Sequence, residues 1–229
     1  MSTTKEFQTK LGVTFSDISL LEQALTHRSY LNENRDEKIG HNERLEFLGD
    51  AVLELATTDR LYRKYPSAPE GELTAYRAAL VNTLSLASIS EELGLNEYIR
   101  LSKGEAKDTG RARQFILANA VEAIIGALYL DKGYATAENF VATYFYPKLD
   151  EIIEKRLWQD AKSLFQERSQ EKAGVTPEYK VLSEEGPDHD KTFTIAVILN
   201  DDEIAQGTGL SKQEAEQSAA RAGLAAKGW

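Results

Sequence analysis

The hydrophobic pattern of this 229-residue chain changes its period once, and that change restricts the possible folds more than any other feature. From about residue 16 to residue 154, apolar residues recur at the spacing of amphipathic helices, with short polar breaks. From residue 178 onward, three extended stretches follow, separated by Gly186-Pro187 and Asn200-Asp201-Asp202, which are typical turn sequences. The pattern therefore predicts a mainly α protein with a small antiparallel sheet near its C-terminus.

The first part of the chain predicts an all-α domain that covers residues 1–156. The spacing of apolar residues predicts helices over residues 16–27, 42–64, 70–93, 115–130 and 139–156. The segment 103–113, which mixes glycine with Lys and Arg, is expected to be a flexible loop, and contact with RNA is an alternative role for it.

The second part predicts a small α+β domain that covers residues 160–229. Helices are expected near residues 161–172 and over residues 211–227, on either side of the three extended stretches. Their order is α-β-β-β-α. Small residues at helical spacing on the last helix would let it lie close against a sheet; they are Ala215, Ala219, Ala222 and Ala226.

Composition and charge exclude several kinds of site. The chain has no cysteine, which removes disulfides, thiolate zinc sites and cysteine nucleophiles, and its three histidines fit a histidine-rich metal site poorly. A net charge of −10 argues against nonspecific coating of nucleic acid and favours carboxylates that hold a hard divalent cation. No apolar run of the roughly 18 residues of a membrane span and no signal peptide are recognised, so we expect a cytoplasmic protein without a membrane partner.

Oxygen-bearing side chains are concentrated on two of the expected helices. Glu43, Glu46 and Asp50 follow one another at spacings of three and four residues, so they share one helix face, and apolar residues border them. Asn119 and Glu122 likewise lie three residues apart among apolar neighbours. If the two helices pack together, these side chains converge on a site that suits magnesium. On the residues alone, a salt-bridge network is an equally good interpretation.

The sequence NERLEFLGDAVL at residues 42–53 resembles the signature of the ribonuclease III family. The resemblance continues through PEGELT at Pro69 and ILANAVEAIIGALYLD at Ile116, and it spans nearly the whole chain. It implies a magnesium-dependent endoribonuclease that hydrolyses double-stranded RNA to 5′-phosphate and 3′-hydroxyl ends. Such an enzyme processes ribosomal RNA precursors and other structured transcripts; manganese can replace magnesium, and no organic cofactor is required.

The resemblance also implies roles for individual residues. Asp50 and Glu122 would lie closest to the reacting atoms, Glu46 and Asn119 would complete the metal site, and two further acidic residues would support it; these are Glu43 and Glu70. The family pattern has Asp where this chain has Asn119, and an amide oxygen can coordinate magnesium but adds no negative charge. We therefore expect weaker metal binding.

Two other functions remain open at this stage. The same fold could belong to a duplex-RNA-binding protein that cleaves weakly or not at all because of Asn119. A magnesium-dependent hydrolase of small phosphorylated molecules is the less favoured of the two, because such an enzyme would have no use for the C-terminal domain.

Phe47 lies within the signature sequence. The resemblance implies a dimer, because proteins of this family are dimeric. The resemblance places Phe47 in a pocket of the partner subunit of a homodimer whose two sites cut opposite strands. Without the resemblance, we would expect Phe47 to be an ordinary core residue, because aromatic residues at helical spacing usually pack inside a protein.

The C-terminal domain resembles the double-stranded-RNA-binding fold in three stretches, SLFQER at Ser163, GPDHDKTF at Gly186 and GTGLSKQEAEQSAA at Gly207. Such domains recognise the shape of duplex RNA and not its sequence. The resemblance implies that six residues contact RNA: Gln166, Glu167, Pro187, His189, Ser211 and Lys212. The family usually has consecutive basic residues at the last site, whereas Gln213 follows Lys212 here, so we expect modest affinity.

Overall fold

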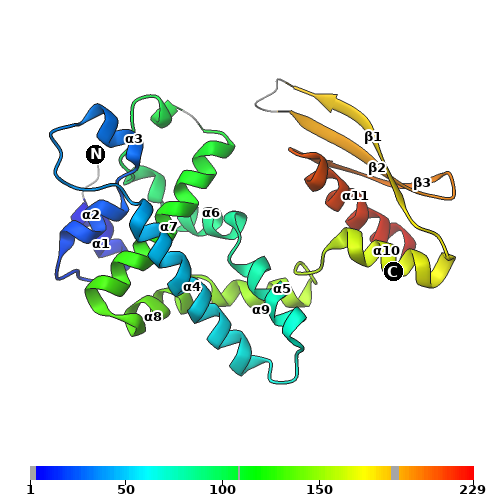
Figure 1. Cartoon of the computed structure of the whole chain (residues 1–229), viewed down its shortest axis with the longest axis horizontal. Helices are drawn as coiled ribbons and strands as arrows, with labels where there is room; N and C mark the ends of the chain where they lie inside the picture. Colours follow the sequence, from blue (N-terminus) through cyan, green and yellow to red (C-terminus); the bar gives the residue numbers. More distant parts are fainter. Residues whose placement is uncertain (1–3, 108, 187–190) are drawn as a thin grey trace. The chain divides into compact units, whose positions relative to one another are not determined.

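The computed structural model describes residues 4–107, 109–186 and 191–229, and it divides the chain into two compact units (Figure 1). Unit 1 is Met1–Trp158 and unit 2 is Gln159–Trp229. Unit 1 is helical, and unit 2 combines a three-stranded antiparallel sheet with two helices. The expected fold class, an all-α domain followed by an α-β-β-β-α domain, is confirmed. Two of the expected RNA contacts, Pro187 and His189, lie outside the described residues.

The described part of unit 1 is built from α-helices and two short 3-10 helices. The α-helices are α1 (Thr4–Leu11), α2 (Ile18–Ala24), α3 (Arg28–Glu33), α4 (Glu43–Lys64), α5 (Glu70–Leu80), α6 (Thr83–Glu92), α7 (Arg111–Lys132), α8 (Tyr134–Tyr144) and α9 (Tyr146–Glu154). The 3-10 helices are η1 (Leu95–Glu97) and η2 (Glu105–Lys107).

Two of the expected helices are each divided in the structure. The segment 70–93 forms α5 and α6, because the side chain of Asn82 accepts a hydrogen bond from the backbone N–H of Ser85 and so starts a new helix. The segment 139–156 is divided between α8 and α9, and α9 has Pro147 in its first turn, where the missing N–H costs nothing. Helices α1 and α3 were not expected, and α7 begins at Arg111, inside the segment expected to be a loop.

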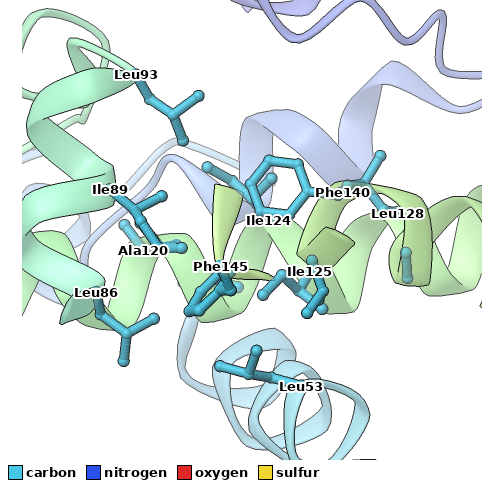
Figure 2. Packing of buried hydrophobic residues seen from close by; sticks show 14 of the residues in the cluster. Leu53, Leu86, Ile89, Leu93, Ala120, Ile124, Ile125, Leu128, Phe140 and Phe145 are labelled. Atoms are coloured by element: carbon cyan, nitrogen blue, oxygen red, sulfur yellow. The ribbon is translucent and has the colours of Figure 1, made fainter. Parts of the chain in front are cut away.

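Helices α4 and α7 form the centre of unit 1 and touch through their backbones at two glycines. A Cβ atom on Gly49 would lie 1.8 Å from the backbone oxygen of Glu122, and one on Gly126 would lie 2.2 Å from the backbone oxygen of Leu45. Any larger residue at either position would force the helices apart. Figure 2 shows the core beside this contact, where Leu53 of α4 and Ile89 of α6 lie close to α7.

Helix α7 is long and apolar enough to cross a membrane, so the expectation that no such run exists is wrong by the measure of length and composition. Ten residues of this helix are buried within unit 1, from Leu117 to Leu128. Such burial is what a central core helix requires, because a helix that is apolar on most sides must be covered by other elements.

Unit 2 places α10 (Ala161–Ala173) and α11 (Lys212–Lys227) against a sheet of order β1-β2-β3. The strands are β1 (Glu178–Glu185), β2 (Thr192–Leu199) and β3 (Asp202–Gly209). Asn200 and Asp201 have φ angles of 51° and 68°, the left-handed backbone that a tight turn between antiparallel strands needs. Helix α11 lies so close on β3 that a Cβ atom on Gly207 would meet the backbone nitrogen of Ala219 at 2.0 Å.

Candidate active site

The contact between Gly49 and α7 brings the acidic residues of the two central helices together. Gly49 lies three residues after Glu46 and directly before Asp50, and its nearest neighbour on α7 is the backbone of Glu122. Because the backbones of α4 and α7 touch at this point, Glu46 and Asp50 come near enough to Glu122 for their charges to act on it. The same geometry places Asn119 beside Glu46, and the two side chains form a hydrogen bond.

The electrostatics of this cluster show that its carboxylates are partly removed from water and repel one another. Burial raises the pKa of Glu122 to about 8, and the charges of Asp50 and Glu46 add to the effect. The pKa of Glu46 is raised by burial and by Glu43, while the hydrogen bond from Asn119 acts in the opposite direction. Burial also raises the pKa of Asp50, with a further contribution from Glu54. A bound cation would relieve this repulsion.

The donor set fits a hard divalent cation. Three carboxylates and one amide oxygen are the ligand types that magnesium and manganese accept, and magnesium needs only a few protein ligands because it keeps several waters. Within the described part of the chain, no three acidic, histidine or cysteine side chains already lie close enough together to hold a metal ion. The carboxylates act on one another through space, at separations longer than those between the ligands of one bound ion.

The two residues expected to support the site lie in different places. Glu43 is adjacent to the cluster, where it raises the pKa of Glu46, and its carboxylate lies 3.3 Å from Nη1 of Arg28. Glu70 accepts a hydrogen bond from Thr74 and lines a pocket of about 270 Å³ beside Leu61. Leu61 follows Glu46 by fifteen residues on α4, which is about 22 Å along a helix axis. Within one chain, Glu70 therefore lies away from the other acidic residues.

The spacing of the acidic residues gave no indication of Gly49 and Gly126, the two glycines that set the geometry of the site. A glycine inside a helix costs about 1 kcal/mol relative to alanine, so its presence usually has a packing reason. Gly49 and Gly126 each lie inside a long helix. Gly49 directly precedes Asp50, and Gly126 lies one turn after Glu122. This signal was present in both sequence motifs.

Phe47 projects from the surface of α4. Its side chain is 82% exposed, so the interpretation of Phe47 as an ordinary core residue is wrong. Leu55 and Tyr62, which are 57% and 72% exposed, follow on roughly the same side of α4. We refer to these three residues as the apolar stripe of α4. An aligned set of large exposed apolar residues is typical of an interaction surface.

The expected RNA contacts that the structure describes lie on the two helices of unit 2. Gln166 and Glu167 are exposed on α10. The hydroxyl of Ser211 accepts a hydrogen bond of 3.2 Å from the backbone N–H of Glu214 and so caps α11, which leaves Lys212 as the first residue of that helix. Lys212 is exposed and forms an ion pair with Glu184 of β1.

Comparisons with known proteins agree with this division of the chain. Residues 17–149 match the family model described as ribonuclease-III-like, and residues 161–226 match the double-stranded RNA binding motif. Ribonuclease 3 of Natranaerobius thermophilus is 49% identical over 215 residues, which cover 94% of this chain and 92% of that protein. Ribonuclease 3 of Enterococcus faecalis is 46% identical over 221 residues, which cover 96% of each chain.

A solved structure of a ribonuclease III nuclease domain also resembles the helical unit of this chain. The nuclease domain of ribonuclease III from Campylobacter jejuni is 39% identical and superposes with a TM-score of 0.57 over 62% of this chain and 98% of that one. The resemblance deduced from the sequence motifs is thus confirmed along nearly the whole chain. This protein belongs to the ribonuclease III family and is an endoribonuclease with a double-stranded-RNA-binding domain.

Proposed function

We propose that this enzyme cleaves double-stranded RNA by magnesium-dependent hydrolysis and leaves 5′-phosphate and 3′-hydroxyl ends. One observation carries the proposal: the backbone contact at Gly49 gathers Glu46, Asp50 and Glu122, and the pKa of Glu122 is raised to about 8. Carboxylates that are crowded together and partly buried are costly unless a cation neutralises them. The cluster is therefore better explained as a metal site than as a network of salt bridges.

The residues of the cluster have distinct roles in this proposal. Magnesium, or manganese in its place, supplies Lewis-acid chemistry that activates water and neutralises charge on the phosphate. Asp50 and Glu122 would hold the cation, and Glu46 would complete the acidic set. Asn119 offers a neutral oxygen and orients Glu46 through their hydrogen bond. No side chain acts as a nucleophile, and no organic cofactor takes part.

We further propose that the enzyme acts as a homodimer through the apolar stripe of α4. Phe47 is its most exposed member, and a group of large apolar side chains exposed on one side of a helix is typical of a protein–protein interface. The Campylobacter jejuni nuclease domain has a region that is involved in dimer formation. A second copy of this chain is thus the partner that fits Phe47.

Unit 2 would hold the substrate. Exposed Gln166 and Glu167 on α10 and Lys212 at the start of α11 are positioned on the surface of a fold that recognises duplex RNA, and Ser211 caps that helix. Pro187 and His189, which lie outside the described residues, remain proposed contacts. We assign the enzyme to the cytoplasm, with ribosomal RNA precursors and other structured transcripts as its substrates.

Incubation of the full chain with long duplex RNA, with and without magnesium, tests the reaction. Cleavage to short duplexes only with magnesium is expected, and Glu122→Gln should abolish it while RNA binding persists. Glu91→Gln, which changes an exposed carboxylate on α6, is the matched control and should cleave at the rate of the unsubstituted enzyme. Binding without cleavage in the unsubstituted enzyme would instead favour the duplex-RNA-binding protein described above.

A further inference from the structure

Glu184, near the end of β1, contacts the lysine that is proposed to hold an RNA phosphate. Its Oε1 lies 3.0 Å from Nζ of Lys212, and its Oε2 lies 3.7 Å from Nζ of Lys191. One carboxylate thus faces two ammonium groups. The pKa of Glu184 is lowered, primarily because Lys212 donates a hydrogen bond to it. The contact with Lys212 thus stabilises the ionised form of the carboxylate.

The sheet holds this arrangement in place. Glu184 and Phe193 are partners in the antiparallel register of β1 and β2, and Nζ of Lys212 lies 5.6 Å from the centre of the Phe193 ring. Lys212 comes from the first turn of α11, so it reaches across the sheet edge to a carboxylate on one strand and a ring on the next. Its position in the RNA-free protein is thus defined by two contacts.

A carboxylate and a phosphate compete for the same donors on a lysine. The ammonium group has three N–H donors, and its affinity for RNA depends on the release of cations from the phosphate backbone. A lysine whose charge is already balanced by Glu184 gains less when it meets a phosphate. In a chain with a net charge of −10, each basic group at the RNA surface matters more.

We propose that Glu184 competes with the RNA backbone for Lys212 and Lys191 and so lowers the affinity of this domain for duplex RNA. A phosphate must displace the Glu184 carboxylate before it can bind Lys212 directly. Glu184 thus sets how tightly the enzyme holds its substrate. The inference rests on the proposed RNA contact of Lys212.

The neighbouring residue offers a matched control. Glu185 is also exposed, on the same strand, and it pairs with Thr192 in the register. Among the residues that the structure describes, Glu185 forms no ion pair. Replacing either glutamate by glutamine changes the net charge by the same amount on adjacent residues of β1, whose side chains lie on opposite faces of the sheet. Only Glu184→Gln removes the direct contact with Lys212.

The test measures the affinity of the full chain for duplex RNA of about 30 base pairs, which exceeds the roughly 16 base pairs that one such domain covers. Magnesium is left out so that the RNA stays intact, and affinity is measured as a function of salt concentration. Glu184→Gln should bind about 5 to 10 times more tightly at low salt, with a salt dependence steeper by close to one phosphate contact. Glu185→Gln should stay within about twofold of the unsubstituted protein, as expected for a surface charge without a direct partner.

The variants separate the possible failures. If Glu184→Gln and Glu185→Gln bind RNA equally, or if Glu184→Gln binds more weakly, competition by Glu184 is refuted. Lys212→Ala should lower the affinity and flatten its salt dependence. If it does so while the two glutamine variants are alike, the RNA contact of Lys212 stands and only the inference about Glu184 fails. If Lys212→Ala binds normally, the proposed contact fails and the inference with it.

Discussion

Substitution of Gly49 by alanine should separate the two central helices and disable the active site. The added Cβ atom would lie 1.8 Å from the backbone oxygen of Glu122, whereas ordinary van der Waals contact begins at about 3.4 Å, so α4 must move by more than about 1 Å. Alanine gains about 1 kcal/mol of helix propensity, but overpacking of a rigid backbone contact costs about 3 kcal/mol or more. We expect a net loss of about 2 kcal/mol in the free energy of unfolding.

The movement should also affect catalysis. It would carry Glu46 and Asp50 away from Glu122, and a displacement of about 1 Å can lower activity by about 100-fold. Initial rates of duplex RNA cleavage at saturating magnesium measure this effect.

The unfolding of unit 1 can be followed on its own. The chain has two tryptophans, and Trp158 packs edge-on against Tyr76 with ring centres 4.9 Å apart. In a Trp229→Phe background, fluorescence during urea denaturation therefore reports on unit 1. Gly71→Ala is the control, because a Cβ atom on Gly71, in helix α5, meets nothing within 4 Å and should be neutral or slightly stabilising.

The outcome that refutes this reasoning is specific. If Gly49→Ala is as stable as Gly71→Ala and cleaves RNA at the unsubstituted rate, the backbone contact does not determine the geometry of the site. Gly126→Ala, whose Cβ atom would lie 2.2 Å from the backbone oxygen of Leu45, should behave like Gly49→Ala.

Three further predictions concern the acidic cluster and the apolar stripe. Asn119→Asp should lower the magnesium concentration for half-maximal cleavage by about tenfold, a change of the size seen when groups around a metal site are altered; an unchanged magnesium dependence would contradict a role of Asn119 at the cation. Without divalent metal, the free energy of unfolding should fall as the pH rises from 4.5 to about 8, by up to about 5 kcal/mol, because only the unfolded state ionises Glu122 freely over that range. Glu122→Gln should lose most of this fall in urea denaturation at a series of pH values, because only the smaller contributions of Glu46 and Asp50 remain, and an identical pH dependence in both proteins would disprove the cause. Phe47→Ala should weaken dimer formation by about 30-fold in sedimentation experiments, whereas Leu84→Ala, which removes a 70% exposed side chain from α6, should leave it unchanged. Equal dimer stability in all three proteins would exclude the stripe as the interface.

Local features of the sequence identified the family, the strands and most of the long helices, but not α1, α3 or the divisions between α5 and α6 and between α8 and α9. The period of the apolar residues predicted α4, the core of α7 and the three strands, because both periods are properties of a single element and its own hydrogen bonds. The divisions at Asn82 and Pro147 were also within reach, since a helix-capping residue and a proline are local signals. Continuous apolar spacing across these positions concealed them.

Tertiary structure decided which of the acidic side chains meet. The sequence determined that Glu46 and Asp50 share a face of α4 and that Glu122 lies on α7, but the approach of the two helices at Gly49 brings these carboxylates together. The tertiary structure also places Glu70 near the C-terminal end of α4, away from the cluster, and exposes Phe47 on the surface. The spacing of residues along one helix follows from covalent geometry, whereas the distance between two helices depends on every side chain packed between them. The raised pKa of Glu122 is a consequence of that packing.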